Sequence, residues 1–387
     1  MPDVLIDPVP DPEPDLAPAS AVACAFVIPG DLTLPTGGYA YDRQVLAGLG
    51  THGVAATHLP LPGRYPSPTA ADLEASTAAL ARLPADTTLL IDGLAYGAFP
   101  VALLARIRQR VVALVHHPLG LEAGLTPTRA AQLIALETAA LARADHIIVT
   151  SPLTKRLLVA DFAVAARDIT VAEPGTAAAG RAVGSRGGSG GNGALQLLAV
   201  GSIVPRKGYP VLIEALAGLR ASAPTRHWQL RIVGSARNAD EAAKLDRAIT
   251  ERDLGAHVQV LGALEGAALD AHYASSDLFV MPSLFEGYGM VLAEAMARGL
   301  PIVCTTGGAA AETVPDAAAL KVPPGDAVAL RQALARAISE PDLRQQLADG
   351  SWAAGQRLPR WDQTCRLVAT AIIATAKIPK PNRGTSA

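Results

Sequence analysis

The chain has 387 residues, which is long for one ordinary domain and comfortable for two domains that each bury a core. A net charge of -2 gives no electrostatic support for a nucleic-acid partner. The three cysteines, Cys24, Cys304 and Cys365, form no metal-ligand pattern, and an odd count provides no disulfide framework, which indicates a reducing compartment. No apolar run reaches the roughly 20 residues that a membrane-spanning helix needs. We therefore expect a cytoplasmic protein, with at most peripheral contact at the inner face of the membrane.

The first half of the chain alternates short apolar runs with longer amphipathic or Ala-rich runs. Residues 1–18 are rich in Pro and Asp without a basic start, which predicts a disordered tail rather than a secretory signal. Residues 19–178 are predicted to form a doubly wound α/β domain, because continuous apolar runs bounded by turn residues are typical of buried parallel strands. The predicted strands are Val22–Ile28, Thr88–Ile91, Val111–Val115, His146–Val149 and Ile169–Ala172, and the predicted helices are Gly38–Leu49, Pro100–Gln109 and Arg129–Ala142.

Residues 179–194 are rich in glycine, and we predict a flexible linker that forms no packed element. The alternation then restarts over residues 195–357, which predicts a second α/β domain. Its predicted strands are Leu195–Val200, Leu230–Val233, Val258–Leu261, Leu278–Met281 and Ile302–Cys304, and its predicted helices are Tyr209–Arg220, Asp240–Glu251 and Met290–Arg298. A break at Pro359 precedes a last helix, Trp361–Ala376, within residues 358–378, and residues 379–387 are a tail. Ligands of such sheets bind beyond the carboxyl ends of the strands, so two domains predict a cleft between them.

A basic segment follows the first strand of the second domain: Gly201-Ser202-Ile203-Val204-Pro205-Arg206-Lys207-Gly208. The two glycines permit a tight backbone path. Arg206 offers a planar fork and Lys207 a compact charge, and this pairing suits a diphosphate. A solvated basic turn is the alternative for the segment taken alone.

A second segment, residues 285–297, follows the predicted strand Leu278–Met281. Gly287 and Gly289 loosen a loop, and the N–H groups of a helix that begins near Met290 can meet a phosphate. Glu294 stands alone in an otherwise apolar helix, which favours a partnered carboxylate over a solvent-facing one. It can accept hydrogen bonds from the two ribose hydroxyls, and Glu286 can do the same for a sugar.

Both segments together, in this order, resemble the family-4 retaining glycosyltransferases of GT-B fold, from about residue 21 to about residue 376. The resemblance implies two Rossmann-like domains that face each other across a cleft. It implies that Arg206 and Lys207 bind the donor diphosphate, that Glu294 binds ribose, and that Glu286 lies beside the donor sugar. The backbone over Tyr288, Gly289, Met290 and Val291 would contact sugar and phosphate. Tyr288 departs from the Phe or small residue that is common there, which could alter sugar selectivity.

The first domain adds two glycines and two histidines at the carboxyl edge of its sheet. Gly37 and Gly38 enter the first helix, either as a donor or acceptor cradle or as a simple turn. His116 and His117 follow the strand Val111–Val115. The resemblance implies that one of them binds the donor sugar, with His117 our first choice; a core histidine is the alternative for the other. We reject a metal site at this pair, because spacing places no third ligand. The predicted catalytic set is thus His117, Arg206, Lys207 and Glu286.

Several other residues invite weaker predictions. Asp92 either caps a helix, which we favour, or contacts the acceptor. Glu122 could face the acceptor, and residues 173–175 form a turn that leaves the domain. Arg106, Arg108 and Arg110 form a solvated face in preference to a site for anionic lipid. The resemblance also places the last helix against the first domain, anchored by Trp361.

The resemblance implies retention of configuration, with the acceptor hydroxyl attacking on the face that the nucleotide leaves. The two cations and the helix start at Met290 would stabilise the leaving diphosphate, and we expect no required metal or other cofactor. Closure about the glycine-rich linker would exclude water. A nicotinamide-dependent oxidoreductase is excluded, because Val22–Ile28 is followed by Pro-Gly-Asp rather than a Gly-rich fingerprint. A GT-B epimerase and a non-catalytic nucleotide-sugar-binding protein stay open, as do the base (near residues 262–265), the sugar, and a saccharide, lipid-linked or small-molecule acceptor.

Overall fold

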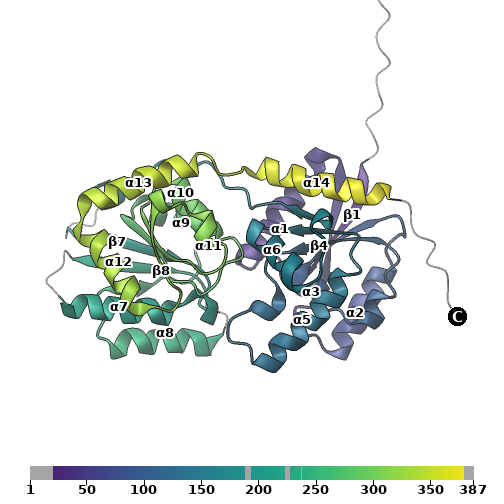
Figure 1. The fold of residues 1–387 in the computed structure, drawn as a ribbon, viewed down its shortest axis with the longest axis horizontal. Coiled ribbons are helices and arrows are strands. Elements are labelled where there is room, and N and C mark those ends of the chain that lie inside the picture. Colours follow the sequence, from purple (N-terminus) through teal and green to yellow (C-terminus); the bar gives the residue numbers. More distant parts are fainter. Residues whose placement is uncertain (1–20, 188–192, 223–226, 237, 379–387) are drawn as a thin grey trace, which may run out of the picture.

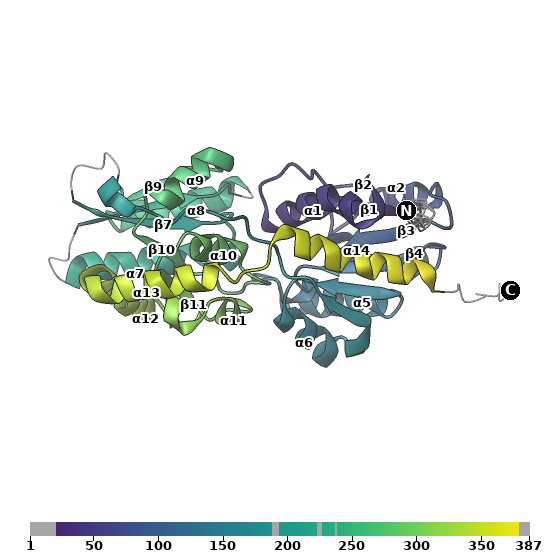
Figure 2. The same cartoon turned by 90° about the horizontal axis from the view of Figure 1, so that it is seen from above.

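The computed structural model describes residues 21–187, 193–222, 227–236 and 238–378. The two predicted tails, 1–18 and 379–387, and the middle of the glycine-rich segment lie outside these residues. Two halves lie side by side, and each contains a parallel six-stranded sheet between layers of helices (Figures 1 and 2).

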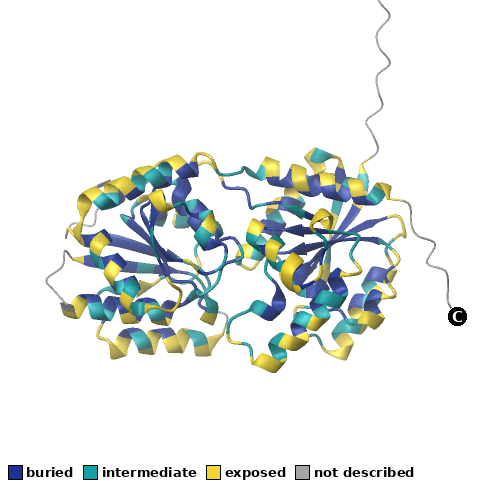
Figure 3. Cartoon of the chain, viewed as in Figure 1, coloured by how far each residue is buried: buried dark blue, intermediate teal, exposed yellow. Residues whose placement is uncertain are grey.

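The sheet of the N-terminal half has the order β2-β1-β3-β4-β5-β6. Its inner strands are the apolar runs of the sequence, and they are buried because helices cover both faces (Figure 3). The strands are β1 (Val22–Pro29), β2 (Val54–Leu61), β3 (Thr88–Asp92), β4 (Arg110–Val115), β5 (His146–Val149) and β6 (Ile169–Val171).

Helices cover both faces of this sheet, and a hydrophobic core lies between the sheet and each helix layer. One layer consists of α1 (Gly37–Gly48) and α14 (Trp361–Lys377). The other consists of α2 (Ala70–Ala81), α3 (Gly93–Tyr96), α4 (Val101–Leu104), α5 (Pro127–Leu141) and α6 (Pro152–Asp161).

The sheet of the C-terminal half has the order β12-β11-β10-β7-β8-β9. Its strands are β7 (Leu195–Val200), β8 (Trp228–Val233), β9 (Val258–Val260), β10 (Leu278–Met281), β11 (Ile302–Thr305) and β12 (Ala319–Val322). One face is covered by α7 (Tyr209–Ser222), α8 (Ala239–Glu251) and α12 (Ala327–Ser339). The other is covered by α9 (Gly266–Ala274), α10 (Met290–Ala297), α11 (Ala310–Thr313) and α13 (Pro341–Gly355).

The strands that sequence reasoning missed, β2 and β12, are both outer strands of their sheets. An outer strand is partly exposed, so it mixes polar with apolar residues and lacks a continuous apolar run. Pro60 in β2 illustrates this, because a residue without an N–H is tolerated only where the ladder ends.

The prediction of a helix over Pro100–Gln109 is wrong. The helix α4 ends at Leu104, and the chain then turns toward β4. Ile107 inserts into the core, and the amide of Gln109 donates to the carbonyl oxygen of Leu83 at 3.0 Å. These tertiary contacts override the local helical pattern.

The prediction that the glycine-rich segment forms no packed element is also wrong where the structure describes it. The N–H of Ala182 donates to the carbonyl of Arg298 at 2.8 Å, and residues Gly184–Gly187 form a short 3₁₀ helix. This segment therefore belongs to the C-terminal half, because its backbone groups find partners there.

The chain crosses between the halves at two segments that lie side by side, one at Thr176 and one at Pro359 and Arg360. Thr176 donates its N–H to the carbonyl of Pro359 at 2.8 Å, and the Arg360 guanidinium donates to the carbonyl of Thr176 at 2.9 Å. These paired segments therefore join the two halves. The glycine-rich segment, about which we expected the halves to close, does not form the connection.

Helix α14 packs on the N-terminal half, as the sequence predicted (Figure 2). Val368 and Ile372 are buried in the core that contains Phe26. Trp361 meets the ring of Tyr41 edge-on at 5.7 Å between centroids. Within the described residues, no helix combines the length and apolar character needed to cross a membrane.

Candidate functional site

The basic loop between β7 and α7 is shaped by its glycines. The backbone of Gly201 has φ of +154°, and a β-carbon there would lie 3.1 Å from Cε of Lys207, so the lysine side chain runs across this glycine. Gly208 has φ of +66°, in the left-handed region that glycine tolerates. A β-carbon there would collide with the carbonyl oxygen of Pro282, which follows β10. The loop thereby aims Arg206 and Lys207 from a single 3₁₀ turn, Pro205–Lys207.

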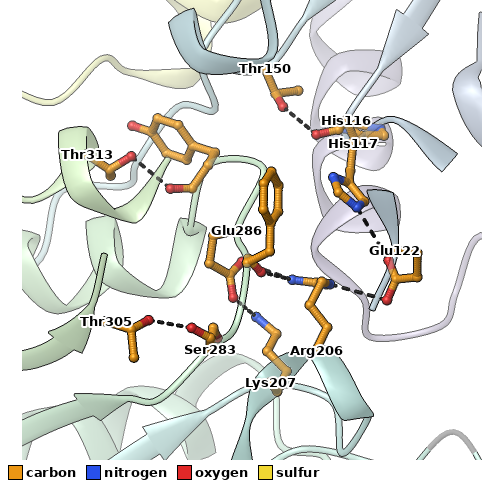
Figure 4. Close-up of polar contacts among 12 residues, drawn as sticks. His116, His117, Glu122, Thr150, Arg206, Lys207, Ser283, Glu286, Thr305 and Thr313 are labelled. Carbon is orange, nitrogen blue, oxygen red and sulfur yellow. Dashed lines mark hydrogen bonds and ion pairs between the residues drawn. The ribbon is translucent and has the colours of Figure 1, made fainter. Parts of the chain in front are cut away.

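Arg206 and Lys207 both converge on Glu286 (Figure 4). Nζ of Lys207 lies 2.7 Å from Oε1, and Nη1 of Arg206 lies 3.3 Å from Oε2. The N–H of Leu284 donates to the carbonyl of Arg206 at 2.7 Å, which joins the two motifs. Burial opposes ionisation of Glu286, but the charges of Lys207 and then Arg206 outweigh it and lower the pKa of Glu286 to about 2. The carboxylate is therefore ionised.

The start of α10 lies beside this cluster. Gly289 caps the helix with φ of +93°, and no side chain occupies the cap. Gly37 at the start of α1 would bring a β-carbon to 4.0 Å from the sulfur of Met290, so two helix N-termini from different halves approach each other. Both carry partial positive charge, which favours an anion in this region.

The second motif also touches the N-terminal half directly. A β-carbon on Gly287 would collide with the carbonyl oxygen of His116. Only glycine allows the two halves to approach so closely here.

His117 lies at this interface with its ring against that of Phe285, 4.7 Å between centroids (Figure 4). Burial, assisted by the charge of Arg206, lowers the pKa of His117 to about 4, so the ring is neutral. Both ring nitrogens are buried without a hydrogen-bond partner in the described part of the chain. Glu122 is the nearest acid, at 3.7 Å from Nε2. A neutral imidazole so placed can donate one hydrogen bond to a ligand and accept another.

His116 points away from this interface, into a buried charge cluster that the sequence did not predict. Its Nε2 lies 3.0 Å from Oδ1 of Asp42 and 3.4 Å from Oδ2 of Asp92. Burial lowers the pKa of His116, but the two carboxylates, Asp42 foremost, more than reverse this and raise it to about 10. Asp42 is an acid, so burial has the opposite effect there and raises its pKa to about 7. The core-histidine alternative thus fits His116, in an ion-paired form.

This cluster also corrects the argument used against a metal. The ligating atoms of Asp42, Asp92 and His116 lie within 4.8 Å of one another, so the fold does supply further ligand types beside His116. Asp42 is 0% exposed, and its Oδ1 is already paired with the imidazole.

Comparison with known proteins identifies the family. Residues 23–175 match the model described as Glycosyl transferase 4-like domain, and residues 191–351 match Glycosyl transferases group 1. The chain belongs to the group 1 glycosyltransferases of GT-B type.

Three curated proteins are similar to this chain in sequence. The chain is 34% identical over 173 residues to a GDP-mannose-dependent monoacylated alpha-(1-6)-phosphatidylinositol monomannoside mannosyltransferase of Corynebacterium glutamicum, which covers 40% of this chain. It is 33% identical over 157 residues to an MMP alpha-(1->4)-mannosyltransferase of Mycolicibacterium hassiacum (40% of this chain) and 28% identical over 177 residues to a mannosylfructose-phosphate synthase of Agrobacterium fabrum (42%). The matches span 44%, 37% and 38% of these relatives' own lengths.

Solved structures share the fold over most of the chain. A sucrose-phosphate synthase from Thermosynechococcus elongatus superposes with a TM-score of 0.75 at 21% identity, over 91% of this chain and 98% of that one. HepE from Anabaena, in complex with UDP and glucose, gives a TM-score of 0.71 at 17% identity, over 90% and 99%. The predicted GT-B fold is thereby confirmed.

The remaining site predictions have mixed outcomes. Asp92 caps α3, with Oδ1 accepting from the N–H of Leu94 at 2.8 Å, as favoured. Arg110 is buried against Asp145 rather than solvated, whereas Arg106 and Arg108 are exposed. The solvated-face prediction is wrong for Arg110 because β4 begins there and carries its side chain into the core.

Of the other predicted residues, Glu122 forms an ion pair with the cluster, and the rest lie near it. Glu122 reaches Arg206 across the interface, with Oε1 3.5 Å from Nε. Tyr288 is buried, and its carbonyl accepts from the hydroxyl of Thr313 at 2.8 Å. A β-carbon on Gly38 would lie 3.5 Å from the His116 ring. Ser202 and Val291 are half-buried.

Sequence reasoning missed Asp42, Phe285 and Tyr273. Asp42 had a usable signal: it lies on the same helix face as Val45 and Leu49, and an acid among buried apolar residues needs a partner. Phe285 and Tyr273 had none, because an aromatic residue beside a strand is ordinary core until its neighbours are known.

Proposed function

We propose that this chain transfers a hexose from a nucleoside-diphosphate sugar to an acceptor hydroxyl, with retention of configuration. The observation that carries the proposal is the convergence of Arg206 and Lys207 on Glu286, beside the start of α10 and the ring of His117. These groups come from both halves, so a ligand bound there contacts both.

The charges of this site suit a diphosphate. Two cations face the ionised carboxylate of Glu286, Glu122 of the other half lies 3.5 Å from Nε of Arg206, and the start of α10 adds partial positive charge. Charge that develops on the leaving diphosphate is stabilised by groups already in place, which makes such stabilisation effective. A divalent ion is therefore not required in this proposal.

Each residue then has a stated role. Lys207 and Arg206 hold the diphosphate, and Glu286 orients these two cations and accepts hydrogen bonds from the transferred sugar. His117 hydrogen-bonds the sugar from the other half. The acceptor hydroxyl attacks on the face that the nucleotide leaves, and the departing phosphate takes its proton, so the proposal needs no covalent nucleophile.

The relatives suggest which donors to test first. GDP-mannose appears in the name of the Corynebacterium relative, and UDP with glucose in the HepE structure. We place GDP-mannose first and UDP-glucose second, with a saccharide, a lipid-linked sugar or a small molecule as acceptor. A cytoplasmic location stays a prediction.

The test measures binding of GDP, UDP, GDP-mannose and UDP-glucose by calorimetry, and donor turnover with and without EDTA. Lys207→Met should lower turnover by about two to three orders of magnitude, as expected when one preorganised charge at a leaving group is lost. Lys321→Met is the matched control, because Lys321 is similarly buried (15% exposed against 12%) and ion-paired in the same half.

The outcomes separate the alternatives. A wild-type protein that binds none of the four nucleotides would remove the proposal. Loss of turnover in EDTA would contradict the metal-free mechanism alone. Conversion of the donor sugar without any acceptor or hydrolysis would instead favour an epimerase.

A further inference from the structure

Glu294, which the family resemblance implies binds the ribose of the nucleotide, has one carboxylate oxygen fixed by the protein. The hydroxyl of Tyr273 in α9 donates to Oε2 of Glu294 in α10 at 2.7 Å. Within the described residues, no protein group hydrogen-bonds to the other oxygen, Oε1. The carboxylate therefore keeps acceptor sites for a ligand while its plane is set by Tyr273.

Tyr273 is itself held from two sides. Its side chain is 1% exposed and stacks on Phe279, with 5.8 Å between ring centroids and 21° between planes. The guanidinium of Arg298 lies 4.6 Å from the centre of its ring. Arg298 also donates to the carbonyl of Glu294 at 3.1 Å and pairs with Asp270. The direction of the tyrosine hydroxyl is thus determined by packing and by charge.

We infer that Tyr273 is a positioning residue that aims the carboxylate of Glu294 at the ribose hydroxyls of the nucleotide; this inference rests on the proposed function. A glutamate side chain has three rotatable bonds, and a carboxylate that is free to turn loses this freedom when it binds a diol. A buried hydroxyl that fixes one oxygen removes that loss in advance.

A second explanation must be separated from this one. Tyr273 could serve stability alone, since a buried tyrosine hydroxyl needs a partner wherever it lies. Both explanations predict that loss of the hydroxyl destabilises the fold. Only positioning predicts that the loss matters for ligands that carry ribose hydroxyls and not for ligands that lack them.

The experiment compares GDP and UDP with their 2′,3′-dideoxy forms by calorimetry. The variants are Tyr273→Phe, Glu294→Ala and the double variant, with Tyr65→Phe as the control. Tyr65 is a matched residue, because it is buried and its hydroxyl bonds to Ser76 at 2.8 Å in the other half.

We expect Tyr273→Phe to weaken binding of the ribonucleotide about tenfold, the effect of one hydrogen bond to a charged group. Binding of the dideoxy nucleotide should change less than about twofold, and the double variant should bind no more weakly than Glu294→Ala, because the tyrosine acts through the glutamate. In turnover, KM for the donor should rise about tenfold with kcat nearly unchanged, since this contact is made equally before and during reaction.

Arg298→Lys is a second variant for the case that Tyr273→Phe does not fold. It keeps the hydroxyl but removes the planar group over the ring. It should weaken ribonucleotide binding about threefold and again spare the dideoxy form.

Equal weakening of ribonucleotide and dideoxy nucleotide would overturn the inference and leave Tyr273 a structural residue, with the proposed function intact. Unchanged ribonucleotide binding in Tyr273→Phe would overturn it as well. If the wild type binds neither GDP nor UDP, the proposed function fails and the inference falls with it.

Discussion

The two halves each contain a buried cluster of charges, and the clusters are balanced in opposite ways. In the C-terminal half, Arg206 and Lys207 outnumber the single carboxylate of Glu286 and lower its pKa to about 2. In the N-terminal half, Asp42 and Asp92 outnumber the single imidazole of His116 and raise its pKa to about 10.

This difference in charge balance indicates which half favours binding of an anion. A surplus of fixed positive charge favours a diphosphate, whereas a surplus of buried carboxylate favours a retained proton. Resemblance alone left either histidine as the ligand-binding one. The structure gives them different surroundings, because the His116 ring is paired with carboxylates while the His117 ring lies against Phe285 at the interface between the halves.

The largest effect is expected for His116→Ala, which would leave two carboxylates buried without their counter-charge. Unfolding in urea at pH 7 should show a loss of about 3 kcal/mol. Because the pKa of His116 is raised from 6.5 to about 10, its stabilisation is fully present below pH 6.5 and is lost as pH rises toward 10. The difference between wild type and variant should therefore narrow above about pH 9.

His146→Ala is the control for this prediction. Its ring is also partly buried, but Nε2 bonds to the hydroxyl of Thr170 at 2.8 Å rather than to an acid. Equal losses in the two variants would mean that the cluster around His116 is not held by charge.

A smaller effect, confined to activity, is expected for Gly287→Ala, which tests the contact between the halves. The added methyl group would collide with the carbonyl of His116 and push the halves apart. We expect turnover to fall about a hundredfold, as displacement by roughly 1 Å can cause. Gly255→Ala adds a methyl group to open space in the same half. If both variants keep wild-type turnover, the donor site does not need this close approach.

The smallest effect is expected for Glu137→Gln, below the loop that carries His117. One oxygen of Glu137 accepts from the N–H of Leu119 at 2.8 Å, and burial raises its pKa to about 8. For a carboxyl with a raised pKa, stability is full below pH 4.5 and is lost as pH rises through 8. The variant should therefore be about 2 kcal/mol more stable than wild type at pH 6, about 1.5 pH units above the ordinary pKa, and nearly equal to it at pH 4.5.

Thermal unfolding across pH measures this difference. Glu251→Gln, at an exposed position of α8, should show no such pH dependence. A difference for Glu137→Gln that stays constant with pH would contradict the ionisation of a buried acid.

The sequence by itself determined the inner strands and the two-half organisation, and it supplied the prediction of the donor-side residues. The inner strands are continuous apolar runs, and Arg206, Lys207, Glu286 and Glu294 lie in two short segments whose order and spacing can be recognised without a structure. The outer strands β2 and β12, the end of α4 and the packed part of the glycine-rich segment were not predictable in this way, because long-range contacts decide them.

Only the tertiary structure decided the partners of the charges. Asp42, Asp92 and His116 are separated by dozens of residues, and the N–H of Gln196 and the hydroxyl of Tyr273 likewise find carboxylates far along the chain. Parallel strands bring their carboxyl ends to one edge regardless of order in the chain, so residues there become neighbours without any local signature. Burial then sets the protonation of each group, and a buried environment exists only once the chain has folded.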